Sequence, residues 1–130
     1  MENKFLGTGE KGYHPLRKIK VVLNGLRFAV LHDFSVLYKV ILSILVFIPV
    51  LLIDSSIIDI SMIIFATGLM IAAELFNTAI EAICDFMETD YNEKIGIIKD
   101  ISAAATGVII FVWFVVLMIE VVNIYRHFFY

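Results

Sequence analysis

The stretch ELFNTAIEAICD, Glu74–Asp85, begins inside a hydrophobic run long enough to cross a bilayer, yet it carries three carboxylates and a carboxamide. At about 100° per helical residue, its polar side chains share one stripe with the next acid: Glu74, Asn77, Thr78, Glu81, Asp85 and Glu88. An ionisable group at membrane depth costs roughly 2.5–3.5 kcal/mol to insert and must be compensated. The stretch therefore predicts a functional site on the polar face of an otherwise apolar helix.

Composition places the whole chain in the class of integral membrane proteins. Of the 130 residues, 61% are hydrophobic and only 18% are charged, and the mean hydropathy is +0.94. Seven of the ten Lys and Arg residues lie in the first third of the chain, which favours contact with a membrane surface and not with nucleic acid. Cys84 is the single cysteine, so no intrachain disulfide can form.

Hydrophobic periodicity predicts an all-α membrane protein with a single membrane-embedded domain over residues 14–130, after a mobile cytoplasmic tail at 1–13. From about residue 15 to 35, apolar residues recur at helical spacing beside basic ones, which is typical of an amphipathic helix in the cytoplasmic interface. A core helix of a soluble protein is the alternative. Three longer apolar runs then approach the ~20 residues of a crossing helix: about 36–53, 57–83 and 101–122.

The distribution of charge predicts the orientation of these spans. Asp54-Ser55-Ser56 has no Lys or Arg nearby and suits a short outer turn, whereas a charged loop from Asp85 to Asp100 suits the cytoplasm. Three spans place the termini on opposite sides, with nine of the ten Lys and Arg residues inside and Arg126 outside. We therefore expect a cytoplasmic N-terminus and an outer C-terminus.

The acidic stripe needs more than helix packing to explain it. Interhelical hydrogen bonds would account for Asn77 and Thr78. Three carboxylates within about 16 Å of helix rise, however, repel one another unless one is protonated or a cation lies among them. Lys94 and Lys99 are candidate partners, and so is a divalent cation that prefers oxygen ligands. The three histidines are too scattered to form a ligand set.

Depth along the helix separates two kinds of chemistry. Glu81 and Asp85 lie at the cytoplasmic end of the second span, and Glu74 lies roughly 10 Å deeper. This arrangement suits a metal-bound phosphate donor in water and a base beside a lipid hydroxyl. An ion-conducting oligomer or a scaffold subunit is the competing class, but neither requires the charged loop or Asp33 on the surface helix.

The stretch Glu74–Asp85 closely resembles the signature of the small prokaryotic membrane lipid kinases, the diacylglycerol kinase and undecaprenol kinase family. The resemblance continues through Asp90-Tyr91-Asn92 and through Lys99-Asp100 with the small residues that follow. Upstream it includes Asn24-Gly25-Leu26-Arg27 and extends to Asp33. It covers about residues 20–122, and a twelve-residue pattern with four fixed polar positions is hard to reach by chance.

The resemblance implies a surface helix and three transmembrane helices, assembled as a homotrimer with shared active sites in the bacterial inner membrane. It implies transfer of the γ-phosphate of MgATP to diacylglycerol, giving phosphatidic acid, with undecaprenol as the second candidate acceptor. Glu74 would be the catalytic base, Asn77 would orient groups in the site, and Glu81 and Asp33 would hold Mg²⁺. The lipid positions would be Glu74 and Ala103, and the nucleotide positions would be Asp33, Glu81, Asp90, Tyr91, Asn92, Lys99 and Asp100.

Several positions depart from the family pattern, among them Phe76 and Cys84, where aliphatic residues are usual, and Ser102, which replaces a glycine. Asp33 stands where a glutamate is usual, Lys39 replaces an acid, and Asn92 replaces a histidine common in relatives. The deep base and its metal partner are both retained.

Overall fold

The computed structural model describes residues 15–53 and 55–129, without the side chain of His32. Four α-helices account for nearly all of this part of the chain: α1 (Pro15–His32), α2 (Phe34–Leu52), α3 (Ile57–Met87) and α4 (Glu93–Phe129). The expected all-α fold is confirmed. The predicted tail at 1–13 lies outside the described residues, as does Asp54 of the predicted outer turn.

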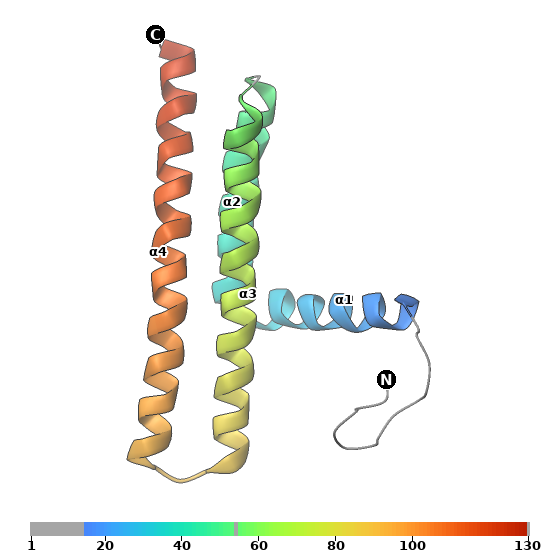
Figure 1. The fold of residues 1–130 in the computed structure, drawn as a ribbon, viewed down its shortest axis with the longest axis vertical. Coiled ribbons are helices and arrows are strands. Elements are labelled where there is room, and N and C mark those ends of the chain that lie inside the picture. Colours follow the sequence, from blue (N-terminus) through green and yellow to red (C-terminus); the bar gives the residue numbers. More distant parts are fainter. Residues whose placement is uncertain (1–14, 54, 130) are drawn as a thin grey trace. The chain divides into compact units, whose positions relative to one another are not determined.

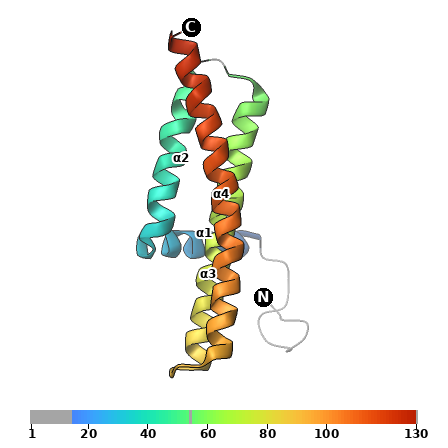
Figure 2. The same ribbon diagram turned by 90° about the vertical axis from the view of Figure 1, so that its left-hand side faces the viewer.

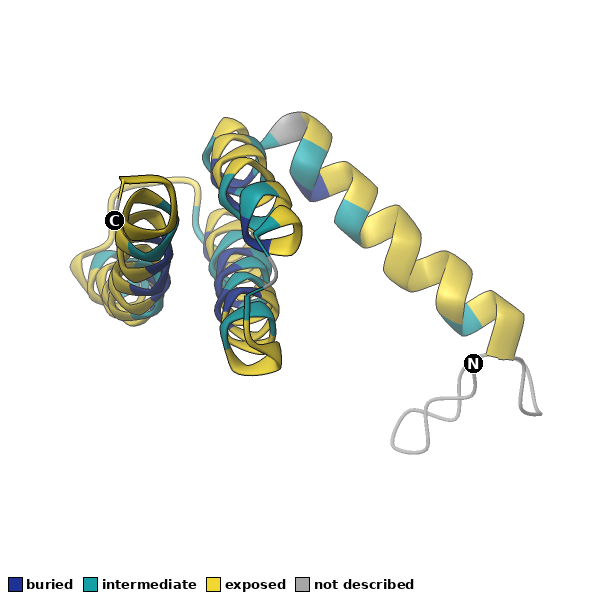
Figure 3. Ribbon diagram, turned by 90° about the horizontal axis from the view of Figure 1, so that it is seen from above, coloured by how far each residue is buried: buried dark blue, intermediate teal, exposed yellow. Residues whose placement is uncertain are grey.

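The chain divides into two units, one over residues 1–33 and one over residues 34–130. The first unit holds α1, and the backbone N–H of Asp33 continues its hydrogen bonding to the carbonyl of Ala29 at 2.8 Å. Most of α1 is exposed (Figure 3). The exposed residues include large apolar side chains such as Leu16 and Phe28. Exposed apolar and basic residues thus occur together on this helix.

The second unit is an up-down-up bundle of α2, α3 and α4 (Figures 1 and 2). The connection between α3 and α4 lies at one end, and the α2–α3 turn lies at the other end with the C-terminal end of α4. α3 packs mainly along α4, and α2 contacts both. Their shared core is apolar: Val50, Ile63, Ala66, Met70, Trp113, Val116 and Leu117.

All three bundle helices are long and apolar enough to cross a membrane. Their outer faces remain apolar, as residues such as Leu45, Phe65 and Phe111 show by their exposure. A soluble bundle would place polar side chains on those faces, whereas lipid solvates apolar ones. The protein is therefore a multi-pass membrane protein.

The ends of α3 follow from local chemistry. Ser56 and Asp59 form a capping box, in which the Ser56 hydroxyl accepts from the Asp59 N–H at 3.3 Å and the Asp59 carboxylate accepts from the Ser56 N–H at 3.2 Å. This capping box fixes the start at Ile57. At the other end the N–H of Glu88 bonds to the carbonyl of Cys84 at 3.1 Å.

The expectation of a charged loop from Asp85 to Asp100 is wrong outside residues 88–92. Asp85 lies within α3, and the acids and lysines from Glu93 to Asp100 form the first turns of α4. Glu and Lys favour helix, so these polar turns extend the apolar spans into water. The 31 and 37 residues of α3 and α4 correspond to about 46 and 55 Å, well beyond the ~30 Å hydrocarbon layer.

Candidate active site

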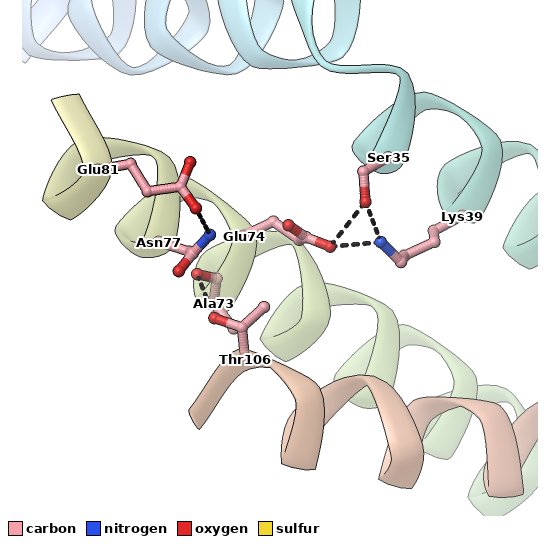
Figure 4. Close-up of polar contacts among 7 residues, drawn as sticks. All are labelled: Ser35, Lys39, Ala73, Glu74, Asn77, Glu81 and Thr106. Atoms are coloured by element: carbon pink, nitrogen blue, oxygen red, sulfur yellow. Dashed lines mark hydrogen bonds and ion pairs between the residues drawn. The ribbon is translucent and has the colours of Figure 1, made fainter. Parts of the chain in front are cut away.

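Glu74 lies buried on α3 and is compensated by a lysine of α2. Its carboxylate forms an ion pair with Lys39, and the two side chains are only 7% and 3% exposed. The hydroxyl of Ser35 donates to the same carboxylate at 3.3 Å, and Lys39 also donates to Ser35 (Figure 4). The Lys39 ammonium lies 4.9 Å from the ring centroid of Tyr38. A tight group of charged and polar atoms therefore exists inside an apolar bundle.

For Glu74 this partner differs from the sequence expectation, which offered Lys94, Lys99 or a cation for the acidic stripe. For Asp85, another acid of the stripe, the expected partner Lys99 is confirmed. Lys39 is separated from Glu74 by 35 residues and belongs to another helix. The available signal was that Lys39 is the one basic residue inside the first apolar run. A lysine in such a run needs an anionic partner as much as a buried glutamate needs a cationic one.

A hydrogen-bonded junction at Ser43 lies one turn beyond Lys39. Its hydroxyl donates to the carbonyl of Lys39 at 3.0 Å and accepts from the Thr67 hydroxyl at 3.1 Å and the Trp113 indole N–H at 2.9 Å. One side chain therefore joins α2, α3 and α4. In an apolar bundle such bonds fix the register of the helices, and here they fix the turn of α2 that carries Lys39. Sequence reasoning missed this role of Ser43.

Asn77 and Glu81 form a second group one to two turns along α3. The Asn77 amide donates to the Glu81 carboxylate at 2.8 Å, and Glu81 is exposed. The Asn77 carbonyl oxygen is buried and has no hydrogen-bond partner within the described residues. Asn77 also lines an apolar groove of about 410 Å³ between α3 and α4, beside Ser102 and Thr106. A residue that bonds to Glu81 thus also lines this groove.

The polar ends of α3 and α4 form a third group around the connection at residues 88–92. Lys99 makes an ion pair with Asp85 from the neighbouring helix. Because Asp85 accepts this hydrogen bond, the pKa of Lys99 lies above its ordinary value. A cavity of about 300 Å³ at this end is lined by both of these residues and by Asp90, Tyr91 and Asn92.

The structure therefore places Glu74, Asn77 and Glu81 in a series along α3, and the other predicted site residues of the bundle in the α3–α4 connection and on α4. Asp90, Tyr91, Asn92 and Lys99 share one cavity. Asp100 and Ala103 are exposed on α4. Asp33 follows α1 and belongs to the other unit.

A comparison with protein families matches residues 20–123 to the prokaryotic diacylglycerol kinases. The chain belongs to that family. The match covers most of the 130 residues and includes every candidate site residue from Asp33 to Ala103. A comparison with curated proteins gave no match. Membership in the diacylglycerol kinase family makes the protein a membrane-embedded lipid kinase, with ATP as phosphate donor and a lipid as acceptor.

The donor atoms of this kinase suit magnesium. Within the described residues no cluster of three or more His, Cys, Asp or Glu side chains is arranged to hold a metal ion. Magnesium does not need such a cage, because it keeps several waters and is usually bound by one or two carboxylates together with substrate phosphates. The exposed carboxylate of Glu81 provides a hard oxygen donor of the kind that this mode of binding requires.

Proposed function

We propose that the protein is a MgATP-dependent diacylglycerol kinase in which Glu74 is the catalytic base. The observation that supports this most is the difference between the two ends of one helix. Glu74 is buried in the apolar bundle, and Glu81, about 10 Å further along α3, is exposed near the polar connection. A lipid hydroxyl can approach the first from the bilayer while ATP approaches the second from water.

In the proposed reaction the Glu74 carboxylate accepts the proton of the lipid hydroxyl. The hydroxyl oxygen forms a bond to the γ-phosphorus, the bond from that phosphorus to the bridging oxygen of ATP breaks, and ADP leaves. Glu74 then releases its proton to water. This in-line transfer needs positioning and charge neutralisation and no covalent enzyme intermediate. Asn77 would orient the reacting groups from its place beside Glu81.

The nucleotide would lie at the polar end of the bundle. Glu81 and Asp33 would hold the magnesium ion, which would neutralise charge on the phosphate oxygens. Lys99 would contribute a positive charge to the phosphates. The other proposed nucleotide contacts are Asp90, Tyr91, Asn92 and Asp100, and three of these line the cavity beside Lys99.

Diacylglycerol is the proposed acceptor, and undecaprenol is the second candidate because it also presents a hydroxyl on an apolar chain. The groove beside Asn77 is lined by apolar side chains such as Phe76 and Ile101, which would suit either chain. Ala103 would contact the lipid from the exposed side of α4.

The test is phosphate transfer from radiolabelled ATP by the purified protein to a panel of lipid alcohols that includes both candidates. We expect labelled phosphatidic acid from diacylglycerol. Transfer to undecaprenol alone would show that undecaprenol, and not diacylglycerol, is the acceptor. No transfer to any lipid would contradict the proposal.

We also propose that the kinase is a homotrimer of the inner membrane with shared active sites. α1 would lie in the cytoplasmic interface, which its exposed apolar and basic residues support. The excess of Lys and Arg before α2 and near the α3–α4 connection supports a cytoplasmic N-terminus and an outer C-terminus. Cross-linking in native membranes should give trimers, and a tag after residue 130 should be accessible only from outside.

A further inference from the structure

The buried ion pair leaves one oxygen of Glu74 available. Lys39 and Ser35 both donate to Oε1 of the carboxylate (Figure 4). Within the described part of the chain, no hydrogen bond reaches Oε2. Fixing one oxygen of a carboxylate limits the rotation of the whole group, so the position of the second oxygen is determined as well.

The charge of Lys39 also bears on the protonation of Glu74. An isolated carboxyl in apolar surroundings shifts toward the neutral acid, because burial penalises the charged form. A cation in contact with the carboxylate offsets this penalty and favours the ionised form. A general base must be ionised before it can accept a proton. The side chains of Lys39 and Glu74 are 3% and 7% exposed, so their contact is shielded from water and favours the ionised carboxylate that a base requires.

We propose that Lys39 is a positioning residue that keeps Glu74 ionised and directs Oε2 toward the lipid hydroxyl. The proposal rests on the proposed role of Glu74 as the base. In the reaction the lipid proton moves to Oε2 and the carboxylate becomes a neutral acid, while Lys39 keeps its proton on Nζ. The uncompensated ammonium then favours release of the new proton from Oε2 to water, which restores the base for the next turnover.

The other polar groups that the structure describes around the pair do not provide a second charge at this depth. On α2 the neighbours are the Ser35 hydroxyl and the phenol of Tyr38. On α3 the next acid, Glu81, is two turns away and is bonded to Asn77. From α4, the Thr106 hydroxyl bonds to the carbonyl of Ala73 and the Trp113 indole bonds to Ser43. Lys39 is thus the described cation that faces Glu74 within the bundle.

The kinetic test compares pH profiles of wild type, Lys39→Met and Lys39→Arg in lipid vesicles. Lys39→Met should lower kcat at pH 7 by about tenfold to a hundredfold and leave the KM for ATP unchanged. Activity should recover as pH rises, because Glu74 then ionises without help. Lys39→Arg keeps the charge and should restore the wild-type profile in part. A Lys39→Met profile that matches wild type would overturn the proposal, as would a loss that is equal at all pH values.

Glu120→Gln is the matched control. Glu120 is another buried carboxyl, 3% exposed on α4, whose amide partner Asn123 lies 3.4 Å away. Its replacement changes a buried acid without touching the ion pair, so the pH profile should stay that of wild type. A shift like that of Lys39→Met would show that any buried charge change has the same effect, and would contradict a specific role for Lys39.

Infrared spectroscopy tests the ion pair without any assay of activity. In the Glu120→Gln background, Lys39→Met should produce the carbonyl band of a protonated carboxyl at neutral pH, and Glu74→Gln should remove that band. A protonated Glu74 in the presence of Lys39 would overturn the proposal. If no lipid were phosphorylated but the infrared result held, the proposed function would fail and the ion pair would stand.

Discussion

Two lysine–carboxylate pairs join helices of the bundle. One pair is buried and the other is exposed, so the loss of one partner has a different effect on each. Lys39 and Glu74 are 3% and 7% exposed, whereas Lys99 and Asp85 are 35% and 67% exposed. Removing one partner of a buried pair strands a charge in a medium that cannot solvate it. An exposed pair exchanges its partner for water or for another anion. The buried pair is thus suited to hold Glu74 in place as a base. The exposed pair is suited to release Lys99 so that it can bind phosphate.

The largest expected difference is in stability. Glu74→Gln strands the Lys39 ammonium and should lower the free energy of unfolding by about 3–5 kcal/mol. Adding Lys39→Met should recover most of that loss, because both charges are then gone. Asp85→Asn, the matched change at the exposed pair, should leave the unfolding temperature unchanged. Thermal unfolding in one detergent measures all of these variants. Equal effects at the two pairs would remove the distinction between them.

Glu81→Gln tests the metal role at the exposed end of the same helix. Loss of the carboxylate should lower kcat/KM by about a hundredfold, or 2.7 kcal/mol. Binding of MgATP should weaken, and the stability should not change because Glu81 is exposed. Magnesium titrations of the purified variant provide the measurement. A titration curve that coincides with that of wild type would show that Glu81 does not bind the metal.

Ser43→Ala tests whether the junction behind Lys39 supports the buried pair. The Trp113 indole and the Thr67 hydroxyl would lose their acceptor in a buried site, at a cost of about 1–3 kcal/mol. Ser61→Ala is the control, since Ser61 is exposed and bonds to the carbonyl of Ile57 in its own helix. The unfolding curves of the two variants should differ. Identical curves would show that the Ser43 junction does not contribute to stability.

The smallest expected effect belongs to Lys99→Met. The exposed pair contributes little to folding, so the unfolding temperature should stay the same. The KM for ATP should rise about tenfold, because one positive charge near the phosphates is lost. The wild-type KM should also rise with ionic strength, and that dependence should weaken in the variant. If Lys99→Met destabilised the protein as much as Glu74→Gln, exposure would not be what separates the pairs.

Much of this fold could be predicted from the sequence because apolar run length is a local property. The run from Ile57 and the capping residues before it set the start of α3. The charge density of Glu93–Asp100 predicts a loop, because it indicates solvent exposure, but exposure does not exclude helix. Glu93, Lys94 and Asp100 are both exposed and helical.

The candidate site was predictable along one helix and not between helices. The stripe from Glu74 to Asp85 follows from helical spacing alone. The pairing of Lys39 with Glu74 depends on how α2 packs against α3, and no local pattern encodes that packing. The same holds for Ser43, whose three partners come from three helices. Tertiary contacts between apolar helices are specified by shape, which a single sequence does not display.

The most direct test of the account is phosphate transfer to diacylglycerol by the Glu74→Gln variant, measured with purified protein in lipid vesicles. We predict a loss of about 10²–10⁴-fold in kcat, with ATP binding retained. The double variant with Lys39→Met, which leaves no stranded charge, should be folded and equally inactive, and Glu120→Gln should be active. Turnover at the wild-type rate in the Glu74→Gln variant would contradict the assignment of Glu74 as the base.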